Sequence, residues 1–423
     1  MIMKNTTNKR VITMAICLIL LSAMLFNLAS CAIEAKAANL MEGIDANVVA
    51  GKQIDEKFID NTADFSIELF KRSLKENENA LISPLSVILA LSMTANGADN
   101  ETLAQMEQVL GGDITIDQLN EYLYTYSNSL PSKDKSKFSI ANSIWFRDDE
   151  ERLQVVPDFL QKNVDYYNAA AYKSAFDDQT LADINNWVKN NTDGMIDKIL
   201  DQISDDAVMY LINAIVFDAE WETIYREDQV AKRDFTNMDG TTVNIDMMNS
   251  EETKFLKDRS ATGFIKPYAN DDYSFVALLP NEDISVYDYI SSLTGETFLD
   301  IITNAQSTGV NATMPKFSYD YTYKMNEALI DMGMPNAFHS EAADFTKMAT
   351  SSRGNIFIFE VLHKTFISVD ERGTKAGAVT KVEMQDECAF MGETVILNRP
   401  FVYAIIDNAT NLPIFIGTVT NLK

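Results

Sequence analysis

The sequence predicts an α+β fold in one large domain. Helical and strand-like patterns alternate irregularly along the chain and do not repeat as the β-α-β units that build parallel sheets. Hydrophobic residues make up 46% of the 423 residues and charged residues 23%, which is ample for a buried core. No linker rich in proline, glycine or serine and no internal repeat divides the chain after residue 57. We therefore expect mixed or antiparallel sheets in a single domain over residues 57–423.

The expected helices begin at capping residues and end at glycine or at a loss of pattern. Ser83 is a good N-cap, and Pro84 suits the first helical position that follows it. Asn100 is expected to cap the next helix, which a glycine pair ends. The four expected helices are Pro84 to about Gly97, Asn100 to Gly111-Gly112, Pro157–Tyr167 and Leu181–Asn190.

The expected strands are short runs rich in β-branched and aromatic residues between turn residues. They are Ala207–Phe217, Phe275–Leu279, Lys316–Tyr323, Asn355–Asp370, Phe401–Ile406 and Pro413–Val419, with a turn at Asn408–Asn411 between the last two. One further run, Glu371–Met384, has uncharged and mostly small residues at its even positions from Thr374 to Met384, and Lys375, Lys381 and Glu383 stand among its odd positions. It continues into residues 385–392, which have no strand pattern. A loop that contains a ready-made strand predicts a protein that changes conformation.

Six motifs in order, from about Lys57 to the C-terminus, resemble the serpins. They are Asn79-x-x-x-Ser83-Pro84-x-Ser86, Asn186-Trp187-Val188 with Thr192-x-Gly194-x-Ile196, Leu211-x-Asn213-Ala214-x-x-Phe217-x-x-x-Trp221, Met314-Pro315-Lys316-Phe317, Glu371-x-Gly373-Thr374-x-Ala376-x-Ala378 and Asn398-Arg399-Pro400-Phe401. The resemblance implies a large mixed β-sheet, two further sheets, about eight to nine helices and an exposed reactive-centre loop over about 371–397. One departure lies after Phe217, where Asp218 and Ala219 replace the usual lysine and glycine and put the packing of that corner in doubt.

The resemblance also implies a function, namely irreversible suicide-substrate inhibition of serine proteases by a native monomer. A target protease cleaves the loop, and the freed segment inserts as a strand before the acyl-enzyme is hydrolysed. The implied site residues fall into three groups. These are the hinge (Glu371, Gly373, Thr374, Ala376, Gly377, Ala378), the breach where the loop enters the sheet (Trp221, Lys316, Glu371) and the shutter under the sheet (Ser83, Ser86, Asn213, His363).

The spacing common in the serpins implies that the target would cut between Glu387 and Phe390. Small Cys388 and Ala389 suit an elastase-like protease, and cleavage between these two ranks first. Glu387 would suit a glutamate-specific protease, and Phe390 a chymotrypsin-like one.

A non-inhibitory serpin that serves as a surface binding or storage protein is the alternative. The hinge has no charge or proline on its inward face, which favours inhibition. An enzyme is disfavoured, because the chain has two histidines and lacks the common hydrolase, metalloprotease and nucleotide motifs. A catalytic triad of His363 with Ser83 or Ser86 is the weakest reading. We expect no metal and no cofactor.

The charge and the N-terminus bear on location. A net charge of −27 repels nucleic acid and anionic lipid, so neither is an expected partner. Residues 1–30 read as a signal segment with three basic residues before an apolar stretch, and they end in Leu28-Ala29-Ser30-Cys31, which resembles a lipobox. Cys31 would then carry a lipid, and residues 31–56 would form a tether. Ordinary secretion with cleavage after Ala37 is the alternative, and in both cases the mature protein is extracellular.

Overall fold

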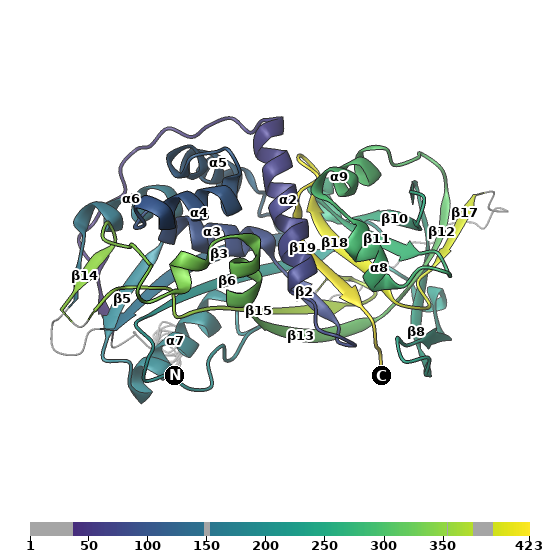
Figure 1. The fold of residues 1–423 in the computed structure, drawn as a ribbon. Helices are drawn as coiled ribbons and strands as arrows, with labels where there is room; N and C mark the ends of the chain where they lie inside the picture. The colour runs from purple at the N-terminus through teal and green to yellow at the C-terminus, as the bar shows by residue number, and fades with distance from the viewer. Residues whose placement is uncertain (1–36, 148–152, 353, 375–391) are drawn as a thin grey trace, which may run out of the picture. The chain divides into compact units, whose positions relative to one another are not determined.

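The computed structural model describes residues 37–147, 153–352, 354–374 and 392–423, which form one compact unit from Ala37 onward. Strands and helices alternate irregularly along the chain, and three larger sheets form (Figure 1). The α+β fold with a large mixed sheet and two further sheets is therefore confirmed.

Sheet A has seven strands in the order β1 (Ala38–Asn39), β5 (Ala170–Ser174), β3 (Ser136–Arg147), β6 (Met209–Glu220), β16 (Gly373–Thr374), β15 (Glu360–Val369) and β13 (Phe317–Lys324). Sheet B has six, in the order β2 (Ala80–Ile82), β19 (Pro413–Val419), β18 (Phe401–Asp407), β11 (Tyr273–Pro280), β10 (Ala261–Pro267) and β9 (Lys254–Lys257). Sheet C has four, in the order β17 (Glu393–Ile396), β12 (Val310–Pro315), β8 (Thr242–Glu252) and β7 (Val230–Thr236). A separate pair joins β14 (Ala349–Ser351) to β4 (Leu153–Val155).

The helices of the described residues are α2 (Glu56–Arg72), α3 (Pro84–Ala95), α4 (Asn100–Gly111), α5 (Ile116–Ser129), α6 (Pro157–Tyr167), α7 (Asp178–Asn191), α8 (Val286–Ser292), α9 (Gly295–Thr303) and α10 (Asn326–Met332). Every residue of α3 is buried, as its all-round apolar sequence requires. Helix α3 packs on β3 and β6 of sheet A and on β19 of sheet B, so it lies in the centre of the core. Helix α7 lies beside β6, on the other side of sheet A from α3 (Figure 1).

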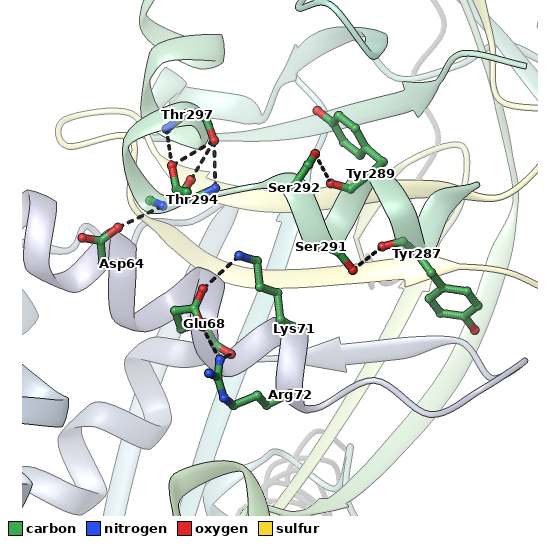
Figure 2. A network of polar contacts seen from close by, with 11 residues as sticks. Asp64, Glu68, Lys71, Arg72, Tyr287, Tyr289, Ser291, Ser292, Thr294 and Thr297 are labelled. Carbon is green, nitrogen blue, oxygen red and sulfur yellow. Dashed lines mark hydrogen bonds and ion pairs between the residues drawn. The ribbon is translucent and has the colours of Figure 1, made fainter. Parts of the chain in front are cut away.

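Helices α2 and α9 meet through a cap shared between them (Figure 2). The Asp64 carboxylate of α2 accepts the backbone N–H of Gly295 at 3.0 Å, where its charge complements the N-terminal dipole of α9. Thr294 and Thr297 complete that terminus as a capping box. A Cβ at Gly295 would lie 2.4 Å from the Asp64 backbone nitrogen, so only glycine allows this close approach.

Several element ends differ from expectation, among them those of α4, α7 and β15. Asp99 and not Asn100 caps α4, because its carboxylate accepts the backbone N–H of Asn100. Helix α7 starts three residues before Leu181, because Asp177 caps it and accepts from Thr180. Residues 355–359 are not part of a strand, and β15 starts only at Glu360.

The expected tether is the larger correction. Its described part, residues 37–56, lies along the domain and does not form a free linker. Ala38 and Asn39 pair with β5 at the edge of sheet A. The backbone N–H of Lys52 donates to the Glu121 carbonyl at 3.1 Å, and Ile44 and Ile54 pack against the core. Backbone pairing and apolar side chains such as Ile44 and Ile54 therefore hold this segment against the domain.

No helix of the described chain is long and apolar enough to cross a membrane. Across the same residues no three His, Cys, Asp or Glu side chains are grouped so as to hold a metal ion.

Candidate functional site

A slot for a further strand runs between β6 and β15 in sheet A. At one end these two parallel strands pair directly, residues 210–212 with 360–362. At the other end β16 lies between them, antiparallel to both, with Thr374 opposite Ala219 and Val369. Between these ends, no pairing joins residues 213–218 of β6 to residues 363–368 of β15 in the described structure. The two strands therefore separate around the inserted pair of residues.

The two inserted residues fit their position closely. A Cβ at Gly373 would lie 1.9 Å from the Ala219 carbonyl oxygen, so glycine is required there. Thr374 is 3% exposed, and its hydroxyl is hydrogen-bonded to the Tyr268 hydroxyl at 2.5 Å. An apolar cavity beside Thr374 is lined by Ile215 and Phe217 among others. Thr374 therefore points inward, toward space that suits small apolar side chains.

Trp221 and its neighbours hold the chain just before the slot. Trp221 is 1% exposed and stacks on Tyr268 with 4.5 Å between ring centroids. Its indole N–H donates to the Asp370 carbonyl at 2.9 Å, and its backbone N–H donates to the Arg372 carbonyl at 2.7 Å. The backbone N–H of Tyr225 donates to the Glu371 carbonyl at 2.8 Å. Three consecutive carbonyls, 370 to 372, are thus bound by the loop that follows β6.

Lys316 and Glu371 form an ion pair at the same place. The ammonium lies 2.6 Å from the Glu371 carboxylate, and both side chains are about one third exposed (31% and 33%). Partial burial, the largest single influence, raises the pKa of Glu371. The hydrogen bond from Lys316, a backbone hydrogen bond and the charge of Lys316 together outweigh it and leave that pKa below its ordinary value. The sequence reasoning placed these two residues and Trp221 together, and the structure brings all three to the end of the slot.

The four shutter residues meet under the slot at the start of α3. The backbone N–H of Ser83 donates to His363 Nε2 at 3.0 Å. The Ser86 hydroxyl donates to the Asn213 side-chain oxygen, and the Asn213 amide donates to Asn142. Burial lowers the pKa of His363 to about 4, so this histidine is neutral at neutral pH. All of these polar groups satisfy one another where the two strands separate.

The shutter geometry does not support a catalytic triad. The Ser83 group that contacts His363 is the backbone N–H and not the hydroxyl. Ser83, Ser86 and His363 are at most 3% exposed, so no substrate reaches them. The group is a structural junction of α3, β6 and β15.

Some described residues of the loop expected over 371–397 belong to strands. Residues 373–374 belong to sheet A, and residues 393–396 form β17, which pairs with β12 in parallel. Asp218 and Ala219, which depart from the family pattern, continue β6 and pair with Lys137 and Ser136 of β3. Hinge residues Ala376, Gly377 and Ala378, cleavage-window residues Glu387, Cys388, Ala389 and Phe390, and Cys31 lie outside the described residues.

Sequence reasoning missed several residues of this site. Tyr268, Asn142 and the buried pair Lys266 and Glu252 were not singled out. Lys266 lies two residues after Phe264 in β10, so strand alternation places it on the same buried face. This alternation alone would have predicted a buried Lys266, but a charged residue is usually expected at the surface.

Comparison with known proteins agrees with this geometry. Residues 60–422 match the family model described as serpin (serine protease inhibitor). Serpin A3-1 of Bos taurus is 29% identical over 373 residues, which cover 85% of this chain and 88% of that protein. The solved native state of a thermophilic serpin, tengpin, is 59% identical with a TM-score of 0.89 and covers 91% of this chain and 100% of its own. The latent state of tengpin is likewise 59% identical, with a TM-score of 0.80 and coverages of 88% and 100%.

Proposed function

Because the chain belongs to the serpin family of serine protease inhibitors, we propose that it traps a target protease irreversibly by inserting its cleaved loop into sheet A. The observation that carries this proposal is β16, which among the described residues occupies the first two positions of the slot between β6 and β15. Both neighbouring strands run antiparallel to it, so the chain that follows Thr374 has a ready path between them.

The register of β16 supports one particular path. Thr374 lies opposite Ala219 and Val369, so each later residue would pair one position earlier on both neighbours. Thr380 would come level with Asn213 and His363 together, which explains why polar shutter residues lie there. Met384 would come opposite Met209, the first residue of β6. The alternating segment recognised in the sequence therefore ends where the slot ends.

Insertion has an identifiable barrier and an identifiable gain. It must separate the three residue pairs that join 210–212 to 360–362, and it must pass the shutter hydrogen bonds. In return, the inserted strand gains backbone hydrogen bonds on both edges and buries its even-numbered side chains. Lys375, Lys381 and Glu383 have odd numbers and would face water. A stable product behind such a barrier makes the native state a kinetic trap.

The chemistry uses the protease's own mechanism. The catalytic serine of the protease attacks the carbonyl carbon of the cleaved bond, the amine on its far side leaves, and an ester joins the two proteins. Insertion then moves the tethered protease along the sheet and distorts its active site before water cleaves the ester. The relative tengpin has been solved in states named native and latent, which supports two folded states for a chain of this kind.

An elastase-like protease is the proposed target class. Cys388 and Ala389 have small side chains that suit a shallow specificity pocket, and we place the cut between them. A glutamate-specific or a chymotrypsin-like protease would instead cut after Glu387 or Phe390.

We also propose that the protein acts outside the cytoplasm, as a lipoprotein anchored at Cys31. The support is the basic and apolar signal segment that ends in Leu28-Ala29-Ser30-Cys31. Cleavage after Ala37 is the competing route, and it would release the protein freely.

The test of the inhibitor function is a denaturing gel of the protein mixed with elastase-like, glutamate-specific and chymotrypsin-like proteases. A covalent complex that survives boiling in detergent is expected with the first class. Mass spectrometry of the released peptide should place the cut between Glu387 and Phe390. Cleavage without any high-mass band, and without a rise in thermal stability of the cleaved protein, would favour a non-inhibitory binding protein.

A further inference from the structure

A buried ion pair lies directly behind the loop that binds the hinge. Lys266 of β10 and Glu252 of β8 are 2% and 6% exposed, and the ammonium lies 2.8 Å from the carboxylate. Ser250 also donates to the Glu252 carboxylate, at 2.6 Å, and the Tyr225 hydroxyl lies 3.2 Å from the Ser250 hydroxyl. The pair joins sheet B to sheet C, and none of the steps proposed above uses it.

The Lys266 ammonium also contacts two aromatic rings of the loop after β6. It lies 4.5 Å from the ring centroid of Tyr225 and 5.5 Å from that of Trp221. A cation at these distances from an aromatic face is attracted to it, and more strongly where water is excluded. Glu252 fixes the ammonium in place, because an unpaired charge here would be strongly unfavourable.

The two rings belong to the residues that bind the hinge. Trp221 donates from its indole and its backbone to the carbonyls of Asp370 and Arg372, and Tyr225 donates from its backbone to the carbonyl of Glu371. A displacement of the Trp221 ring moves its indole donor away from the Asp370 carbonyl, and the Tyr225 ring is attached to the residue whose backbone binds Glu371. The chain of contacts therefore runs from Glu252 through Lys266 to the two rings and then to residues 370–372.

We propose that Lys266, held by Glu252, is a positioning residue that clamps the Trp221–Tyr225 loop and so sets how readily the hinge leaves its native position. The consequence for inhibition rests on the proposed function. A looser clamp changes both the rate at which the intact loop enters the sheet and the share of encounters that end in a trapped protease. Lys266 itself contacts neither the protease nor the cleaved bond.

The experiment separates a positioning role from a contribution to stability. Lys266→Met removes the cation and leaves Glu252 unpaired, so both global stability and hinge binding should fall. Lys266→Met with Glu252→Gln removes both charges, and the glutamine oxygen can still accept from Ser250. Replacing a whole buried pair is often neutral for stability. The double variant should therefore unfold in denaturant like the wild type while its hinge remains loosened.

Hinge binding is measured by hydrogen exchange of the indole N–H groups in protein labelled with nitrogen-15 tryptophan. The Trp221 indole donates to the Asp370 carbonyl. Its exchange should become about tenfold faster in the double variant, because the loss of two cation–π contacts corresponds to a factor of about that size. The Trp145 indole is an internal reference, because it donates at 3.0 Å to Ser143 within β3. Phe298→Leu in α9 is the matched control, a core variant that lowers stability away from the hinge.

The inference is overturned if Trp221 exchange is unchanged in the double variant, or if Trp145 exchange rises equally. It is supported if Trp221 alone changes and Phe298→Leu does not reproduce the effect. Titration of each variant against a protease then gives the number of inhibitor molecules consumed per protease blocked. If the wild type blocks no protease, the proposed function fails, while the exchange result still decides whether Lys266 clamps the loop.

Discussion

Replacing Thr374 by arginine tests the direction in which the inserted segment faces. Thr374 is 3% exposed, and its described surroundings are the Tyr268 hydroxyl and an apolar cavity lined by residues such as Ile215 and Phe217. A guanidinium carries five N–H donors, and this site offers it one hydroxyl. We therefore expect Thr374→Arg to leave the inserted position in the native state and to oppose re-entry after cleavage.

The size of the effect follows from the burial. An unpaired charge in such a site costs about 4 kcal/mol, which slows insertion about a thousandfold if the cost is felt at the barrier. Hydrolysis of the acyl-enzyme then becomes faster than insertion, so the protease releases the variant as a cleaved substrate. Titrating a fixed amount of protease with the variant measures this as a large rise in inhibitor consumed per protease blocked, with cleaved inhibitor replacing complex on the gel.

Thr374→Val is the matched control. Valine keeps the shape and the strand preference but leaves the buried Tyr268 hydroxyl without its partner, which costs about 1 kcal/mol. Its stoichiometry should stay close to that of the wild type. A wild-type stoichiometry for Thr374→Arg would refute the inward orientation and with it the register of the proposed insertion.

Three further predictions concern the breach, the shutter and the N-terminus. Glu371→Lys should produce polymers on mild heating, because its positive charge would repel that of Lys316. The charge-swapped variant that adds Lys316→Glu should stay monomeric. A Glu371→Lys variant that stays monomeric at temperatures where the wild type polymerises would contradict this prediction. Since burial lowers the His363 pKa to about 4 from an ordinary 6.5, the unfolded state binds more protons between these values, and the stability to denaturant should fall by about 3 kcal/mol as the pH drops from 6.5 to 4. His363→Gln should remove that pH dependence, and an unaltered pH profile would exclude His363 as its source. Cys31→Ala should abolish labelling by a fatty-acid analogue and release the protein from membranes, whereas normal processing after Ala37 in this variant would indicate ordinary secretion.

Local signals predicted the fold well where a single short segment decides the structure. Helix α3 begins at Pro84 as its cap demands, and β19 runs over Pro413–Val419 as its pattern indicates. The expected end of β6 at Phe217 was three residues early, because Asp218 and Glu220 are acidic and look unlike strand residues. Their strand geometry comes from backbone pairing with β3 and β16, which no local pattern encodes.

Some residues of the candidate site could likewise be predicted from the sequence, and others could not. The resemblance to the serpins grouped Lys316, Glu371 and Trp221, and the structure places them together at one end of the slot. The partnership of Lys266 with Glu252 depends on how sheet B meets sheet C, so neither residue shows it in its own segment. A charged side chain is usually exposed, and only the tertiary fold reveals one that is buried and paired.

The short pairing of β1 with β5 determines which end of the molecule an anchor would hold. Ala38 pairs with Lys173, Lys173 with Phe146, and Phe146 with Met209, so the chain enters the sheet at the end farthest from Thr374. If Cys31 carries a lipid, the six residues from there to Ala37 reach at most about 20 Å. Thr374, where insertion of the cleaved segment would begin, would then lie at the end of sheet A away from the anchor. If the cleaved segment inserts as proposed, its end would come opposite Met209, so each captured protease would be drawn toward the cell surface and held there.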